Sequence, residues 1–308
     1  MARWLRVLWM MLLVSGALQA QTIGVLCAGE LVLVEASGLR VRASVGPLGS
    51  PRSLAASPDG KLLAVGSDDD TIHLYSLPEG KTRGAIQNPY LKGAVGLAFS
   101  ADGHSLLVLS EGVKALVEVG LDGQIHRVLG LNGPAPVTWS VQGSTLLVVQ
   151  QAGWVSQVSL DGWETVRQDT LALPVGGAAL AGEVLVVSHP DQSQLRLLAG
   201  EDRQELANHG VGPGARAVQA SPHGDLVVVI SELADSITAV DPSTGKLVWK
   251  SDTGKRPRDL LFSRDGKWLY VANQESSDLS VFEAVSGREL GKLPLPPGPQ
   301  ALIWIPSR

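Results

Sequence analysis

The stretch Ser263-Arg264-Asp265-Gly266-Lys267-Trp268-Leu269-Tyr270-Val271-Ala272-Asn273 decides the fold of this 308-residue chain. It joins a polar turn that contains a glycine to a run of aliphatic and aromatic residues. Glycine supplies the positive φ that tight turns need, and a short apolar run bounded by turn residues is typical of a buried strand. The stretch therefore predicts a turn that leads directly into a buried strand.

The same turn and strand occur six times along the chain. The turn glycines are 39 to 43 residues apart, and they are Gly60, Gly103, Gly143, Gly182, Gly224 and Gly266. An apolar run follows each of them, such as Leu62-Leu63-Ala64-Val65 or Leu226-Val227-Val228-Val229. A fixed period of this length is typical of repeat architectures, in which each period forms one supersecondary unit.

A second series of turns lies about twenty residues after the first. Its seven glycines are Gly38, Gly80, Gly123, Gly162, Gly200, Gly245 and Gly287. An alternating strand comes before each turn, as in Thr71-Ile72-His73-Leu74-Tyr75, and a more polar strand comes after it. Each period thus holds an inner strand, an apolar second strand, an alternating third strand and a polar outer strand, which together make one blade of a β-propeller.

The chain has seven turns of the second kind but only six of the first. A closed ring explains this difference if the chain begins inside a blade, after that blade's innermost strand. Residues 23–45 then supply three strands of that blade, and residues 300–305 supply its inner strand. A split blade ties down both ends of the chain and leaves no free sheet edge in the ring. We therefore predict an all-β fold, a single seven-bladed β-propeller of four-stranded blades over residues 21–308, in which Ala301–Ile305 pairs with a strand near Val25–Ala28.

The first twenty residues have the pattern of a secretory signal peptide. Arg3 and Arg6 precede an apolar stretch from Val7 to Leu18, and a small residue, Ala20, precedes Gln21. The apolar core is about a dozen residues, whereas a membrane-spanning helix needs roughly 20. We expect cleavage after Ala20, a periplasmic or extracellular location, and no permanent membrane anchor.

The charge of the chain argues against nucleic acid as a partner. The formal net charge is −5, and no long run of Lys and Arg occurs. A phosphate-binding surface needs a clustered excess of Lys and Arg. The partner is therefore expected to be a protein or a small molecule.

The blade that runs from Ser263 to Asn273 and continues with Leu279-Ser280-Val281-Phe282 resembles the YVTN family of β-propeller repeats. The resemblance covers most of the mature chain, and the wider group is similar to lactonase-like and cytochrome d1-type propellers. The repeats contain no Trp-Asp dipeptide, so the sequence does not support the WD40 class. A second segment, residues 239–249, resembles the tryptophan-docking motif of quinoprotein dehydrogenases, but it is intact only once, and we interpret it as a hairpin turn.

The titratable residues do not predict a metal site or a cofactor. The histidines occur singly, without the spacing of a zinc motif, and they are His73, His104, His126, His189, His209 and His223. The run Asp68-Asp69-Asp70 lacks the spaced ligands of a calcium loop. The single cysteine, Cys27, excludes a disulfide framework, and we interpret it as a small buried residue.

The turns between the second and third strands are polar in most blades, and the topology places them on one face of the ring. Among their residues, Asp69, His189 and Glu232 are candidate ligand-binding residues. We expect this face to be acidic and polar around the central channel.

Three arginines stand at equivalent positions at the start of inner strands. Arg52, Arg216 and Arg258 each lie five residues before the turn serine of their own blade. Guanidinium groups bind carboxylate and phosphate in a bidentate fork, so their convergence would create an anion site at the channel mouth. The alternative is that they pair with the acidic residues of the neighbouring turns.

The sequence thus leaves two hypotheses for function. The first is a non-catalytic scaffold of the cell envelope, or a secreted one, that binds a protein or a small anionic ligand at the channel face. The second is a lactonase-like or lyase-like enzyme that uses His189, Glu232 and a divalent ion at the channel mouth. No catalytic motif distinguishes them.

Overall fold

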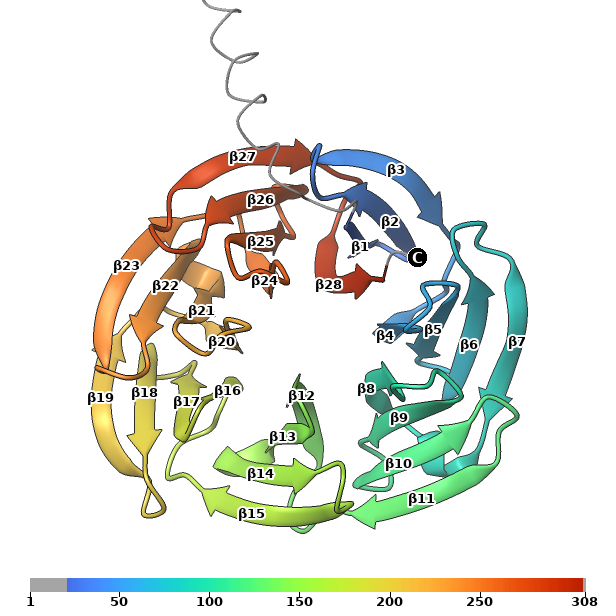
Figure 1. Ribbon diagram of the computed structural model, residues 1–308, viewed down its shortest axis with the longest axis horizontal. Helices are drawn as coiled ribbons and strands as arrows, with labels where there is room; N and C mark the ends of the chain where they lie inside the picture. The colour runs from blue at the N-terminus through green and yellow to red at the C-terminus, as the bar shows by residue number, and fades with distance from the viewer. Residues whose placement is uncertain (1–20, 307–308) are drawn as a thin grey trace, which may run out of the picture.

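A computed structural model describes residues 21–306, which form a closed ring of seven four-stranded antiparallel sheets (Figure 1). The seven-bladed β-propeller predicted from the repeats is therefore confirmed. The expected signal peptide, residues 1–20, lies outside the described residues. No helix in the described part is long and apolar enough to span a membrane.

The strands of each blade follow one another from the axis outward. The innermost strands of blades 1 to 7 are β28 (Pro299–Ile305), β4 (Pro51–Ala56), β8 (Ala94–Phe99), β12 (Pro136–Gln142), β16 (Gly177–Ala181), β20 (Ala215–Ala220) and β24 (Pro257–Phe262). The second strands are β1 (Thr22–Cys27), β5 (Leu62–Ser67), β9 (Ser105–Ser110), β13 (Thr145–Gln150), β17 (Val184–His189), β21 (Val227–Ser231) and β25 (Trp268–Asn273).

The third and outer strands complete the blades in the same order. The third strands are β2 (Glu30–Glu35), β6 (Thr71–Ser76), β10 (Ala115–Gly120), β14 (Trp154–Ser159), β18 (Gln194–Ala199), β22 (Ser236–Asp241) and β26 (Asp278–Glu283). The outer strands are β3 (Arg40–Val45), β7 (Thr82–Gln87), β11 (Ile125–Gly130), β15 (Glu164–Thr170), β19 (Gln204–Gly210), β23 (Lys246–Asp252) and β27 (Glu289–Pro294). Three short 3-10 turns are η1 (Pro89–Leu91), η2 (Gln151–Gly153) and η3 (Glu232–Ala234).

Side-chain hydrogen bonds explain why the Ser-x-Asp-Gly sequence forms the turn between the first two strands. The Ser57 hydroxyl donates to Asp59 Oδ1 at 2.6 Å, and the same carboxylate oxygen accepts the Lys61 N–H. Gly60 adopts a φ of +67°, and a Cβ at this position would collide with the Pro306 carbonyl oxygen. The glycine is therefore required by the turn and by the close approach of the C-terminal segment.

The hydrophobic core is divided among the seams between blades. Each of the seven apolar clusters combines residues of two neighbouring blades. Alternate residues of a second strand serve opposite seams: Val228 belongs to the seam with blade 7, and Val227 to the seam with blade 5. The central residues of the second strands are mostly apolar because both faces of these strands are buried.

The ring closes where the two ends of the chain meet. Strand β28 pairs antiparallel with β1, with Ala301 opposite Leu26 and Ile305 opposite Thr22. The predicted closure is confirmed, although the pairing reaches further toward the N-terminus than Val25–Ala28. Cys27 is fully buried at the end of β1, as predicted, and burial raises the pKa of its thiol to about 12.

Polar side chains also join the innermost strands of neighbouring blades. The Ser53 hydroxyl donates to the Ala94 carbonyl at 2.8 Å, and Asp259 Oδ2 accepts the Leu302 N–H at 2.8 Å. Between blades 6 and 7, Gln219 Oε1 accepts the Phe262 N–H at 3.2 Å. These contacts satisfy backbone groups that no sheet partner reaches.

Deletion of residues 299–308 tests the closure. The truncated chain loses the whole of β28, including the buried side chains of Leu302 and Ile305. Burial of two such side chains stabilises by about 3 to 6 kcal/mol, and the exposed edge of β1 adds to the loss. We expect a large fall in Tm in a circular-dichroism melt, with deletion of residues 307–308 alone as the control. An unchanged Tm would contradict closure of the ring by β28.

Candidate functional site

The innermost strands all begin on one face of the ring, which we call the entry face. The end of each second strand pairs with the start of its innermost strand, as Ser67 does with Pro51 and Ser231 with Ala215. The turns between second and third strands therefore lie on the entry face. This places Asp69 and Glu232 on the face where the arginine-bearing strands begin.

A buried carboxylate on the entry face collects three guanidinium groups. Glu232 lies in η3, directly after β21, and only 5% of its side chain is exposed. Arg258 Nη1 and Arg256 Nε donate to its Oε1 at 2.7 and 2.9 Å. Arg216 Nη1 donates to its Oε2 at 3.0 Å. We refer to Arg216, Glu232, Arg256 and Arg258 as the arginine cluster.

The arginine cluster carries more positive than negative charge. Arg256 Nη1 also contacts Glu275 at 3.1 Å, so three guanidinium groups face two carboxylates, which leaves an excess of one positive charge. Arg216 and Arg256 remain 53% and 45% exposed, and only part of their N–H groups is used. The cluster can therefore accept a further anion without losing its internal pairs.

The surroundings of Glu232 keep it ionised. Burial by itself raises the pKa of Glu232, but the hydrogen bonds from Arg256 and Arg258 and the positive charges beside them outweigh burial. The pKa of this carboxyl is therefore lower than its ordinary value. An acid held in this form is a weak proton acceptor, so Glu232 is better suited to position the arginines than to act as a general base.

Arg256 is the residue that the repeat pattern misses. It precedes β24, in a left-handed conformation with a φ of +54°, and its N–H donates to Asp235 Oδ1 at 2.7 Å. Blade symmetry points only to the equivalent positions of Arg52, Arg216 and Arg258. The local run Lys255-Arg256-Pro257-Arg258 is the sequence signal that indicates a second arginine at this site.

Arg52 and Asp69 do not belong to the arginine cluster. Arg52, on blade 2, contacts Glu111 at 3.1 Å and Asp68 at 3.5 Å. Asp69 accepts the Thr71 N–H and lies 3.3 Å from His73 Nε2. The structure thus brings together Arg216, Arg258 and Glu232, and it leaves the blade 2 residues in a separate group of ion pairs.

His189 is placed away from the exposed part of the entry face. It is fully buried at the end of β17, and its Nδ1 lies 2.9 Å from the Pro174 carbonyl oxygen. Burial lowers the pKa of His189, so its imidazole is neutral. The equivalent residues Ser110 and Gln150 also bond to the segment that leads into their own blade. His189 therefore anchors a connecting segment.

The structure does not assemble the metal centre of the second hypothesis. Within residues 21–306, no three His, Cys, Asp or Glu side chains are grouped so that they could hold a metal ion. His189 contacts Pro174, whereas the Glu232 carboxylate is bonded to three arginines. Neither side chain is presented to the other.

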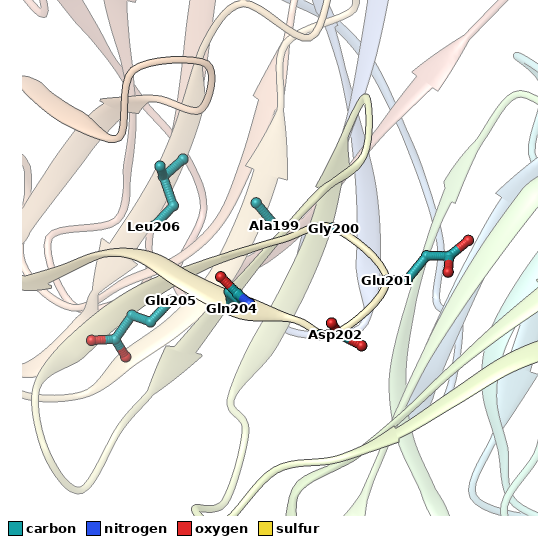
Figure 2. Close-up of a pocket in the computed structure, with 7 residues that line it drawn as sticks. All are labelled: Ala199, Gly200, Glu201, Asp202, Gln204, Glu205 and Leu206. Carbon is teal, nitrogen blue, oxygen red and sulfur yellow. The ribbon is translucent and has the colours of Figure 1, made fainter.

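A depression of about 370 Å³ lies along the hairpin that joins β18 and β19 (Figure 2). Its lining comes from this hairpin alone, and the side chains of Glu201 and Glu205 point away from each other. Functional groups do not converge there. A second, apolar depression lies between blades 7 and 1.

Comparisons with known proteins agree with the fold. A family model described as a seven-bladed β-propeller lactonase matches residues 179–294, and a model of the WD domain, G-beta repeat, matches residues 43–76. The WD match falls on a blade without the Trp-Asp dipeptide, so the absence of that dipeptide was a poor guide to WD40 likeness. No curated protein matches the chain in sequence.

Two solved structures with the same architecture are distant from this chain in sequence. Hydrazine synthase of Kuenenia stuttgartiensis has a TM-score of 0.69 and 16% identity, over 84% of this chain and 90% of that one. KlHsv2 with loop 6CD replaced by a Gly-Ser linker has a TM-score of 0.59 and 18% identity, over 80% of this chain and 81% of that one. These likenesses establish that the chain is a seven-bladed β-propeller.

Asp259, on the innermost strand β24, has a raised pKa, whereas the pKa of Glu232 is lowered. Burial raises the pKa of Asp259 to about 6, and the N–H groups of Leu302 and Leu260, which lower it, do not compensate. The pKa of an unfolded Asp is about 3.9. Because the folded state holds the proton more tightly, this group favours folding at low pH and opposes it once the pH rises above about 6.

Asp259→Asn removes this titration and keeps an oxygen that can accept the Leu302 N–H. The free energy of unfolding of the variant, relative to that of the wild type, should rise between about pH 4 and pH 8. The rise is at most roughly 2 to 3 kcal/mol, because the folded and unfolded pKa values of Asp259 differ by about two units. Urea unfolding at both pH values measures the difference. Equal pH dependence in the two proteins would show that Asp259 has an ordinary pKa.

Proposed function

We propose that this protein is a ligand-binding or partner-binding propeller of the cell envelope, or a secreted one, whose arginine cluster binds an anionic group on the entry face. The single observation that carries the proposal is the excess positive charge of three arginines around Glu232, with Arg216 and Arg256 about half exposed. The location rests on the N-terminal sequence pattern alone.

The arginines are pre-organised for binding. Glu232 accepts one N–H from each guanidinium group and thereby orients all three from two neighbouring blades. Leu233, the next residue, is 69% exposed and borders the cluster. An exposed apolar residue beside arginines is typical of surfaces that bind a protein partner.

The strength of anion binding follows from the exposure of the arginines. A charge-assisted hydrogen bond stabilises by about 1.5 to 3 kcal/mol when it is shielded from water, and by roughly 0 to 1 kcal/mol on the surface. The half-exposed guanidinium groups lie between these limits. Binding of a small anion should therefore be modest and sensitive to salt.

A titration of small dicarboxylates and inorganic phosphate at low salt tests the proposal. The double variant Arg216→Gln/Arg256→Gln keeps Arg258 on Glu232 but removes the positive excess, and we expect binding to weaken at least tenfold. Arg52→Gln is the matched control, because Arg52 occupies the equivalent strand position outside the cluster. Equal binding by all three proteins, or no binding by any, would overturn the proposal.

The lactonase match is the observation that favours a second candidate function, an enzyme acting on lactones. It covers residues 179–294, which include the whole arginine cluster. The arginines could stabilise the negative charge that develops on a lactone carbonyl, but the lowered pKa of Glu232 disfavours it as the base.

Hydrolysis of δ-valerolactone, followed in a pH-stat with and without added divalent ions, distinguishes the two functions. A binding protein leaves the rate unchanged. Acceleration by the wild type that is lost in Glu232→Gln and retained in Arg52→Gln would instead establish an enzyme.

A further inference from the structure

Four blades begin their innermost strand directly after a residue in the left-handed backbone region. In three of them this residue is glycine, and φ is +61° at Gly93, +74° at Gly214 and +76° at Gly298. The fourth is Arg256, which precedes β24 with a φ of +54°. This conformation is unfavourable for a residue with a Cβ but not for glycine. The repeat thus favours glycine at this position, whereas blade 7 carries an arginine that belongs to the arginine cluster.

Asp235 holds the backbone of Arg256 in this conformation. Its Oδ1 accepts the Arg256 N–H at 2.7 Å, and the Gln274 N–H donates to the Arg256 carbonyl oxygen at 2.9 Å. These contacts fix the residue from blade 6 on one side and from blade 7 on the other. A backbone conformation that is unfavourable by itself persists when its surroundings fix it in this way.

The same pair of contacts occurs between blades 2 and 3, around a glycine. Asp70 Oδ1 accepts the Gly93 N–H at 2.9 Å, and the Glu111 N–H donates to the Gly93 carbonyl oxygen at 2.9 Å. Asp70 and Asp235 both stand directly before a third strand, with φ values of +60° and +50°. The aspartate contact is therefore a feature that these two seams share, and between blades 6 and 7 it acts on an arginine.

The backbone conformation of Arg256 determines where its guanidinium group lies. The φ angle sets the direction of the Cα–Cβ bond relative to the preceding chain, and here the side chain reaches Glu232 through Nε at 2.9 Å and Glu275 through Nη1 at 3.1 Å. The side chain remains 45% exposed, so a ligand can reach it. Residues held in unfavourable backbone conformations cluster where ligands are bound.

We infer that Asp235 is a positioning residue for the arginine cluster: by accepting the Arg256 N–H, it holds the Arg256 guanidinium group where the cluster binds an anion. The inference rests on the proposed function for its ligand and extends it to a residue that contacts Arg256 through the backbone. The second carboxylate oxygen, Asp235 Oδ2, accepts Lys255 Nζ at 2.7 Å. The hydrogen bonds from the Arg256 N–H and from Lys255 lower the pKa of Asp235, so its carboxylate is charged.

The sign of the effect on binding separates positioning from electrostatics. Asp235 places a negative charge beside a cationic site, so its removal should strengthen anion binding if only its charge matters. Positioning predicts the opposite. Without the carboxylate, Arg256 can leave the left-handed conformation, and its guanidinium group then moves away from Glu232.

Titrations of inorganic phosphate and of succinate at low salt compare Asp235→Gly with Asp235→Asn. Both variants remove the same charge, and both new residues tolerate a positive φ, but only asparagine keeps an oxygen that can accept the Arg256 N–H. We expect Asp235→Gly to bind about fivefold more weakly than the wild type, which corresponds to one ordinary hydrogen bond, and Asp235→Asn to bind at least as tightly as the wild type. Asp70→Gly is the matched control and should bind like the wild type, because Asp70 holds a glycine.

Heteronuclear NMR of the Arg256 Nε–H group tests the positioning without any ligand. Its signal, identified by its loss in Arg256→Gly, should exchange slowly with solvent in the wild type because Nε donates to Glu232. We expect faster exchange in Asp235→Gly and unchanged exchange in Asp235→Asn. If none of the proteins binds an anion, the proposed function fails, and this signal alone decides whether Asp235 positions Arg256.

Three results would overturn the inference. The first is anion binding by Asp235→Gly that equals or exceeds that of the wild type, because Asp235 then acts only through its charge. The second is weakening of binding in Asp235→Asn or Asp70→Gly as large as that in Asp235→Gly. The third is unchanged exchange of the Arg256 Nε–H group in Asp235→Gly.

Discussion

Burial of both faces of each blade against its two neighbours is the constraint on which the structure depends. A four-stranded blade by itself leaves two apolar faces in water, and each apolar cluster of this protein is built from two adjacent blades. Every blade therefore needs a neighbour on each side, and only a closed ring provides one for all seven. The pairing of β28 with β1 supplies the last of these seams and makes stability a property of the whole ring.

The seams differ in how they are fastened, although the strands repeat. Near the axis, Ser53, Gln219 and Asp259 bond to backbone groups of the next blade. At the outside, His209 Nε2 lies 2.7 Å from the Gly245 carbonyl oxygen, and Trp249 docks on Gly287. Small or glycine residues in the hairpin turns let the outer strand of one blade lie close to the next. A seam without a filling side chain, such as the one beside Gly291, remains partly open.

On the entry face, one buried carboxylate controls the chemistry of the surface. Removing Glu232 from water is costly unless it is paired, and the three arginines that pair with it become oriented in turn. The result is a rigid group of positive charge beside an exposed leucine. The ion pairs that Arg52 makes with Asp68 of blade 2 and with Glu111 of blade 3 contain more negative than positive charge, so the face is electrostatically uneven.

Glycine spacing and the alternation of apolar residues determined the architecture from the sequence alone, because turn conformation and strand burial depend on local residue types. The equivalence of Arg52, Arg216 and Arg258 also follows from the repeat, since it is a matter of register within a blade. Which charges meet is a different question. Arg256 joins the arginine cluster because its backbone adopts a left-handed conformation. Arg52 pairs with Glu111 of the next blade, and His189 contacts the Pro174 carbonyl oxygen in the interior. Only the tertiary structure decided these contacts, because they form between blades whose distances and side-chain orientations are not encoded in any single repeat.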